Sequence, residues 1–217
     1  HPQSPRAQYE LAWAYMFYIV STKDASLAPL AVAAAERSKA ADKGSINQDV
    51  GLGYMFAELH DMPKAQAYLD AAAVDATTAS PSATLQLALL TLTYMTSPED
   101  QPLFASMDKV MTNAAANPTL AHYGCYTAVT WNSLALFRQK IGNIPGALNA
   151  MHQAVTLCPV LAQMRVNFAR MLLYYNDPQD AGEQIDALRH LGDVRFLPDL
   201  LQLEQQRDQE LHPENKK

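Results

Sequence analysis

The segment from Trp131 to Pro159 places apolar and small residues at helical spacing in two runs with a break between them. Residues at i, i+3, i+4 and i+7 share one face of a helix. Gly142-Asn143 interrupts the pattern, and Pro159 ends it. The small residues let two helices approach closely, so the segment predicts an antiparallel helical hairpin. The spaced positions are Trp131, Leu134, Ala135 and Arg138 in the first run, and Ala147, Met151 and Ala154 in the second.

The same pattern recurs along the chain. Ala147 and Ala181 are 34 positions apart, and an earlier segment shows Gly53 and Ala65 in the matching small positions. This pattern resembles the tetratricopeptide repeat, which has W-x2-L-G-x2-Y, A-x3-F and a closing Pro at a spacing of about 34 residues. The resemblance implies an all-α fold, a right-handed superhelix of about five antiparallel helix pairs with a C-terminal capping helix. We expect one domain over 1–217, with pairs at 4–43, 45–77, 82–117, 121–159 and 161–190, and a cap at 194–211.

Two parts of the chain fit the repeat less closely. In the first pair, the second helix is expected at 27–42, with Ala33, Arg37 and Ala40 on its packing face. In the third pair, 82–95 is expected to be helical and 96–102 to be a loop, because Pro98 and Pro102 disfavour a helix.

Composition excludes several classes of function. The formal net charge of −6 argues against a nucleic-acid surface, which needs a basic footprint. No run of about 18 apolar residues is present, so no membrane span is predicted. The sequence has no G-x-S-x-G, H-E-x-x-H or P-loop motif, and its histidines are not paired at helical spacing. We therefore expect a non-catalytic protein without cofactor or metal, and we assign Gly51 and Gly53 to helix packing.

The first helix of each pair is expected to line a concave groove, which is the default binding site for such repeats. The groove is predicted to bind a protein or peptide segment, because aromatic residues and Arg are enriched at interfaces. For Trp13, Phe17 and Tyr54, packing against neighbouring helices is the alternative. We do not expect the protein to bind the acidic C-terminus of a partner protein. Repeat proteins that do so use Lys, Asn and Arg side chains, and the corresponding positions here include Tyr9, Trp13 and Gly51. The candidate residues are Arg6, Tyr9, Trp13, Phe17, Asn47, Tyr54, Glu58, Asn132, Gln139, Lys140, Arg170 and Tyr174.

The two cysteines of the chain flank the Trp131 hairpin. Cys125 precedes the first helix and Cys158 ends the second, so an antiparallel pairing brings them together. A disulfide there would close a loop of about thirty residues, worth about 3 kcal/mol in the chain-entropy model. It would also imply an oxidising compartment such as a periplasm. Two small buried thiols are the alternative, and a cytoplasmic location then stays open.

The opening residues resemble the junction in certain bacterial polytopic membrane proteins, where a glycosyltransferase-like region precedes tetratricopeptide repeats. The resemblance covers His1 to Ala12. It implies a periplasmic accessory domain of a membrane-bound glycosyl or oligosaccharide transferase, which positions an acceptor or partner protein. The chain begins without Met, and we expect a mature or trimmed fragment. Self-association through an exposed terminal helix is a further expectation.

Overall fold

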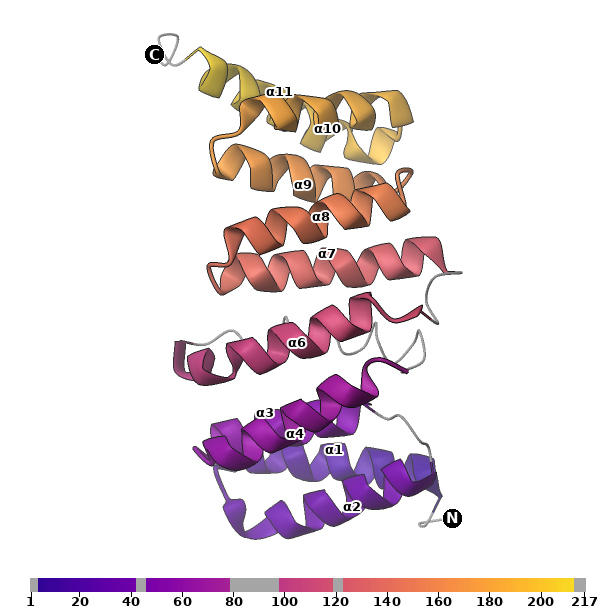
Figure 1. The fold of residues 1–217 in the computed structure, drawn as a ribbon, viewed down its shortest axis with the longest axis vertical. Helices are drawn as coiled ribbons and strands as arrows, with labels where there is room; N and C mark the ends of the chain where they lie inside the picture. The colour runs from indigo at the N-terminus through magenta and orange to yellow at the C-terminus, as the bar shows by residue number, and fades with distance from the viewer. Residues whose placement is uncertain (1–3, 42–45, 79–97, 119–122, 213–217) are drawn as a thin grey trace.

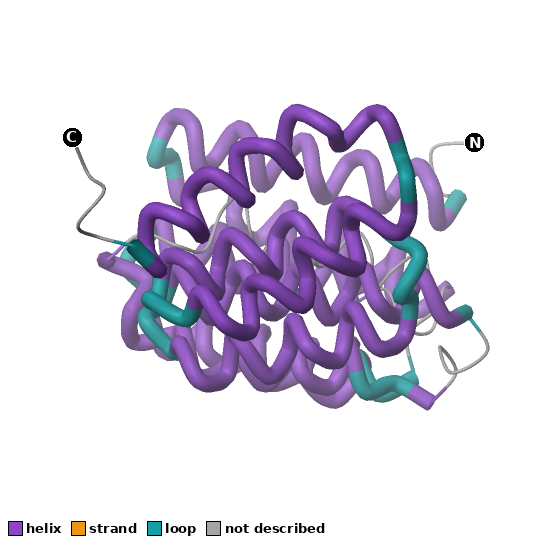
Figure 2. The backbone as a smooth tube through the Cα atoms, turned by 90° about the horizontal axis from the view of Figure 1, so that it is seen from above, coloured by secondary structure: helices purple, strands orange, loops and turns teal. Residues whose placement is uncertain are grey.

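The computed structural model describes residues 4–41, 46–78, 98–118 and 123–212 (Figure 1). Every regular element within these ranges is helical, as the purple segments of Figure 2 show. The α-helices are α1 (Pro5–Thr22), α2 (Ala28–Ala41), α3 (Ile46–Glu58), α4 (Met62–Asp75), α6 (Phe104–Ala115), α7 (Gly124–Lys140), α8 (Ile144–Leu157), α9 (Ala162–Tyr174), α10 (Pro178–Leu191) and α11 (Leu197–Leu211). The 3₁₀ segments are η1 (Ala25–Leu27), η2 (Pro98–Leu103) and η4 (Val194–Phe196).

Consecutive helices pack as pairs that stack along one axis, from the indigo N-terminal end to the yellow C-terminal end of Figure 1. The pairs are α1 with α2, α3 with α4, α7 with α8 and α9 with α10. Helix α6 contacts α4 on one side and α7 on the other, and α11 contacts both α9 and α10. The prediction of an all-α solenoid is confirmed. The helix expected at 82–95 lies outside the described residues.

One turn geometry recurs in three of the pairs. A residue with positive φ ends the first helix, and the Asp or Asn after it caps the second helix through its side chain. The backbone N–H of that capping residue also donates to a carbonyl of the first helix, at 2.8 to 2.9 Å. A short turn of this kind returns the chain at once, so the two helices must lie antiparallel. The turns are His60-Asp61, Gly142-Asn143 and Asn176-Asp177.

Small residues set the helix spacing inside the pairs. A Cβ on Gly53 of α3 would lie 2.9 Å from Leu69 of α4, so only glycine allows this approach. In the α7–α8 hairpin, the expected contact positions Ala147, Met151 and Ala154 have no exposed surface. This burial confirms the packing face that the helical spacing of the three residues predicts.

Two expectations about local structure were wrong. On α2, Ala31, Ala34 and Ala35 are buried, whereas the expected packing residues lie at the edge of that face. Ala33 is half-buried, Ala40 is exposed, and the exposed Arg37 reaches α1 through a hydrogen bond from its Nε to Gln8 at 2.7 Å. The helix is therefore rotated from the expected register, because a run of alanines presents similar faces on every side. The segment 98–103 is the 3₁₀ segment η2. Its Pro98 stands at the start, where the missing N–H costs nothing.

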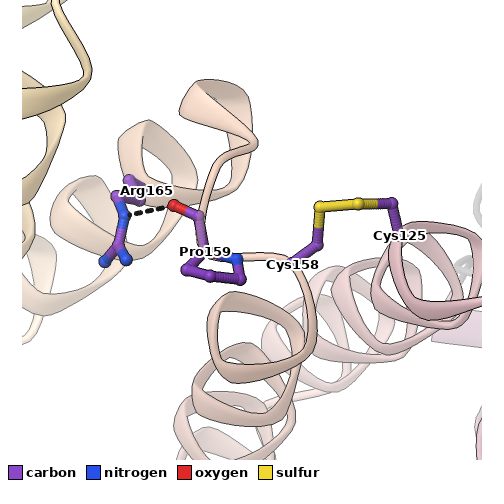
Figure 3. The surroundings of a disulfide bond; sticks show 4 residues. All are labelled: Cys125, Cys158, Pro159 and Arg165. Atoms are coloured by element: carbon purple, nitrogen blue, oxygen red, sulfur yellow. Dashed lines mark hydrogen bonds between the residues drawn. A yellow bond between two sulfur atoms is a disulfide. The ribbon is translucent and has the colours of Figure 1, made fainter.

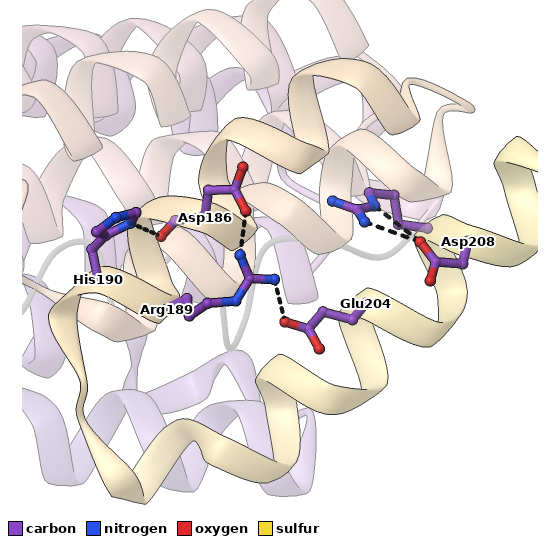
Figure 4. Close-up of polar contacts among 6 residues, drawn as sticks. Asp186, Arg189, His190, Glu204 and Asp208 are labelled. Carbon is purple, nitrogen blue, oxygen red and sulfur yellow. Dashed lines mark hydrogen bonds and ion pairs between the residues drawn. The ribbon is translucent and has the colours of Figure 1, made fainter.

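Arginine side chains connect successive units of the stack. Arg138 of α7 binds both carboxylate oxygens of Asp108 on α6, at 2.6 and 2.9 Å, and also reaches Thr112 at 2.9 Å. Arg189 of α10 lies between Asp186 and Glu204, and so joins α10 to the cap α11 (Figure 4). Hydrogen bonds to Glu204 and Asp186 raise the pKa of Arg189.

Candidate binding surface on the first helices

The first helices of the described pairs, α1, α3, α7 and α9, bear the residues that the sequence singles out. We call the surface of these four helices the first-helix face. Its parts differ in exposure, and the differences decide which residues a partner can reach.

An aromatic row runs along α1. Tyr9, Trp13 and Phe17 stand one turn apart, with ring centroids 6.3 and 5.7 Å from each other in order. A Cβ on Gly51 of α3 would lie 2.9 Å from the Trp13 ring, so Trp13 packs against α3. Phe17 is 48% exposed. Arg6 is exposed and Tyr9 is half-buried. Trp13 thus anchors the row against α3, and Phe17 is its exposed end.

The residues expected from α3 do not project into an open surface. Asn47 is only 3% exposed, because α3 begins inside the stack and its first turn is covered. Tyr54 is half-buried against the core. Glu58 forms an ion pair with Lys23 at the end of α1. The expectation that Asn47 lines the groove is therefore wrong.

A buried ion pair fixes the start of α3 instead. Lys39 Nζ of α2 lies 2.8 Å from both carboxylate oxygens of Asp49, whose side chain is fully buried. Burial raises the pKa of Asp49, and the Lys39 ammonium opposes that shift. For Lys39, burial is outweighed by the hydrogen bond and the charge of Asp49, so its pKa is raised. The pair joins α2 to α3, and its buried carboxylate is not accessible to a ligand.

Two polar side chains of the α1–α3 region have buried atoms without a hydrogen-bond partner. They are Nε1 of Trp13 and both amide atoms of Gln48, which has no exposed surface. A buried polar group without a partner costs about 1–3 kcal/mol. These unpaired groups therefore lower the stability of the α1–α3 region.

Side-chain amides join α7 to α9 on the first-helix face. Asn167 Nδ2 of α9 donates to Oδ1 of Asn132 on α7 at 3.0 Å. One turn earlier on α9, Gln163 Nε2 donates to Oδ1 of Asn167, also at 3.0 Å. We call these three residues the amide relay. Asn132 and Asn167 are half-buried, and Gln163 is exposed.

Two further predicted residues, Arg170 and Tyr174, lie on α9 beyond the amide relay. Arg170 is exposed and pairs with Asp199 in the first turn of the cap, at 2.5 Å. Tyr174 is 74% exposed, and its ring meets that of Tyr175 edge-on at 4.9 Å. On α7, Gln139 is half-buried and Lys140 is exposed. Gln163, Asn167, Arg170 and Tyr174 thus form one stripe at helical spacing on α9.

Sequence reasoning selected Asn132, Arg170 and Tyr174 but missed Gln163 and Asn167. One signal was available, since Asn132 and Asn167 are 35 residues apart, close to one repeat length. Equivalent positions of successive repeats lie side by side in a solenoid. Two asparagines at that spacing therefore predict a pair.

The two cysteines lie at the end of the α7–α8 hairpin that is opposite to its Gly142-Asn143 turn. Cys125 in the first turn of α7 and Cys158 just after α8 form a disulfide, with their Cα atoms 4.8 Å apart (Figure 3). The residue after Cys158 is Pro159, whose carbonyl accepts a hydrogen bond from Arg165 Nε at 3.0 Å. The disulfide therefore ties the start of α7 to the α8–α9 loop.

Within the described ranges, no group of three His, Cys, Asp or Glu side chains is arranged to hold a metal ion. The helices of those ranges include none that is both long and apolar enough to cross a bilayer. The first-helix face offers side-chain amides for hydrogen bonding, aromatic rings, and the exposed guanidinium groups of Arg6 and Arg170.

Comparisons with known proteins give no family. No protein-family model and no curated protein matches the sequence. Among solved structures, the chain is similar to MamA 41-end from Desulfovibrio magneticus RS-1, at 15% identity and a TM-score of 0.42, with 85% of this chain and 95% of that chain covered. The architecture therefore rests on the helix contacts of the chain itself. These contacts define a tetratricopeptide-like α-solenoid.

Proposed function

We propose that the protein is a non-catalytic scaffold that binds an extended peptide segment on the first-helix face, at the amide relay and the α9 stripe. The amide relay is the observation that supports this function most. It places uncharged hydrogen-bonding groups from two successive repeats at one place on the surface.

The chemistry of the relay suits a peptide main chain. A side-chain amide has two donor hydrogens and an acceptor oxygen. The two bonds within the relay use Asn167 Nδ2, Gln163 Nε2 and the oxygens of Asn132 and Asn167. Asn132 Nδ2 then stands as a donor at one end, and Gln163 Oε1 as an acceptor at the other. A peptide group offers the complementary pair, a carbonyl oxygen and an N–H.

The α9 stripe would add contacts beside the relay. Tyr174 offers a large ring with few rotatable bonds, and Arg170 offers donors that Asp199 already orients. Such aromatic and Arg side chains dominate the energetics of many interfaces. The amide relay would therefore bind the main chain of a peptide that lies along α9, and Arg170 and Tyr174 would select among its side chains.

Peptide display followed by main-chain methylation tests this function. Random peptides would be selected on the protein, and the tightest binder would be resynthesised with N-methyl groups at single positions. We expect at least one N-methyl group to weaken binding about tenfold, because it removes a peptide N–H that donates a hydrogen bond to Gln163 Oε1. If every N-methylated peptide bound as tightly as the parent, recognition by the relay would be excluded.

The disulfide supports an oxidising location, such as a periplasm, since such bonds persist there and are rare in the cytosol. Acid-quenched cells of the source organism, treated with a thiol-reactive mass tag, would report the state of Cys125 and Cys158. We expect no tag on the protein before reduction. Full tagging before reduction would place the protein in a reducing compartment. A role beside a membrane-bound glycosyl or oligosaccharide transferase stays a prediction from the opening residues alone.

A further inference from the structure

The two cysteine residues of the disulfide differ in access to solvent. Cys125 is exposed in the first turn of α7, whereas Cys158 is only 1% exposed. Figure 3 shows the bond reaching from Cys125, in the first turn of α7, across to Cys158 in the loop after α8. A reagent that approaches from solvent therefore reaches the exposed residue Cys125 more readily than the buried residue Cys158.

The two chain segments that carry this bond are uncharged and partly apolar. Between Lys109 and Arg138, and again between Lys140 and Arg165, the sequence has no Asp, Glu, Lys or Arg. Exposed apolar side chains flank the disulfide, with Tyr126 at 57% and Val160 at 69% exposure. No carboxylate in these two stretches would repel an incoming thiolate.

The loop that holds Cys158 has anchors besides the disulfide. Arg165 donates Nε to the Pro159 carbonyl at 3.0 Å and Nη1 to Gln184 at 2.9 Å. The Leu161 N–H donates to the carbonyl of Cys158 at 3.3 Å. Opening the disulfide would therefore leave Cys158 near its place, with the Cα atom of Cys125 close by for the bond to form again.

We propose that Cys125–Cys158 is a thiol–disulfide exchange site, at which an external thiolate forms its mixed disulfide with Cys125. The thiolate attacks Sγ of Cys125, and a new sulfur–sulfur bond forms as the bond to Cys158 breaks. The electron pair of the broken bond goes to Sγ of Cys158, which takes a proton. A second external thiol then attacks the mixed disulfide and releases Cys125 as a thiol. Two external thiols are oxidised to one disulfide, and the protein disulfide is reduced by two electrons.

Mapping the mixed disulfide tests this assignment. The oxidised, folded protein would be treated briefly with reduced glutathione and quenched in acid. Freed thiols would then be capped with N-ethylmaleimide, and the peptides identified by mass spectrometry. We expect glutathione on Cys125 and the cap on Cys158, with a preference of at least about tenfold. Equal labelling, a preference for Cys158, or exchange only in urea would overturn the proposal.

Single-cysteine variants give an independent measure of access. Cys158→Ser leaves Cys125 as the only thiol, and Cys125→Ser leaves Cys158. We expect the Cys125 thiol to react with an aromatic disulfide reagent at least about tenfold faster in the folded protein, and at a similar rate in urea. Circular dichroism would verify that both variants are folded. Similar rates in the folded state would contradict the proposal.

A trapping experiment would show whether the external thiol belongs to a protein or to a small molecule. A dithiol oxidoreductase lacking its resolving cysteine forms a stable mixed disulfide with its target. Trapping on Cys125 faster than by an equal concentration of glutathione would identify a protein reductant, and the reverse order a small thiol. Trapping on Cys158 would overturn the site.

Discussion

Asn167 of α9 donates its side-chain amide to Asn132 of α7 at 3.0 Å, across the boundary between two repeats. Gln163 in turn fixes the oxygen of Asn167 at 3.0 Å. The amides are thus oriented before any partner arrives, which lowers the entropy cost of binding. This preorganised relay is the basis of the proposed peptide site.

Replacing Lys39 by Met should destabilise the protein, because Asp49 would keep a buried charge without its partner. Loss of one member of a buried ion pair costs about 3 kcal/mol or more. Urea unfolding followed by circular dichroism would measure it. Lys39→Arg retains the charge and serves as the control, with a smaller expected loss. A Lys39→Met variant as stable as the parent would show that the pair is not buried as described.

The pH dependence of that variant has a definite sign. Burial raises the pKa of Asp49 above its usual value of 3.8. A group with a raised folded-state pKa contributes stability below its unfolded pKa and loses that contribution as pH rises through the folded pKa. Without Lys39 the shift should grow, so Lys39→Met should lose less stability at pH 5 than at pH 8. A loss independent of pH would contradict this account of Asp49.

Gln48→Met should stabilise the protein. The amide of Gln48 is fully buried, and neither of its polar atoms has a hydrogen-bond partner. An apolar side chain of similar shape removes that cost, which is about 1–3 kcal/mol. Thermal unfolding would report the change. A marked loss of stability would show that the Gln48 amide is bound in solution.

Two glycines in helices should respond to alanine in opposite directions. At Gly53, the new Cβ would lie 2.9 Å from two carbons of Leu69, so Gly53→Ala should cost about 1–3 kcal/mol through overpacking. At Gly182, the Cβ would lie 3.6 Å from the mobile end of Arg207, so Gly182→Ala should gain about 0.5–1 kcal/mol from helix propensity. Urea unfolding of both variants would decide. Equal effects would show that the spacing of α3 and α4 does not depend on Gly53.

Removing the disulfide should lower the free energy of unfolding without unfolding the hairpin. The bond joins residues 33 positions apart, and closing a loop of this size is worth about 3–4 kcal/mol in the chain-entropy model. The double variant Cys125→Ser and Cys158→Ser should therefore be less stable by that amount and equally helical. Wild-type protein in excess reductant should match it. An unchanged midpoint in urea would show that the bond does not stabilise the fold.

Short-range features of the fold were readable from the sequence. Gly142-Asn143 and Asn176-Asp177 predict helix ends because one residue tolerates positive φ and the next caps a helix. The repeat distance from Ala147 to Ala181 predicts the pairing of helices. The cysteines were expected to meet for the same reason. In each case the information lies within one hairpin or one repeat length.

Features that depend on rotation about a helix axis, or on distant segments, were not readable. The alanine run of α2 hid which face is buried, and the groove register for α3 placed Asn47 on the surface although it is buried. The partner of Arg170 is Asp199, which belongs to the cap rather than to a repeat. Such relationships follow from how repeats stack and not from a local pattern.

The most direct test of the proposed site is the affinity of one selected peptide for the double variant Asn132→Ala and Gln163→Ala, measured by fluorescence anisotropy. Asn149→Ala is the matched control, because Asn149 is an exposed asparagine on α8, away from the relay. Loss of two neutral hydrogen bonds, at about 1 kcal/mol each, should weaken binding about tenfold or more. The control should bind as the wild type does, and all three proteins should be equally helical. Equal affinity of the double variant and the wild type would contradict peptide recognition by the amide relay.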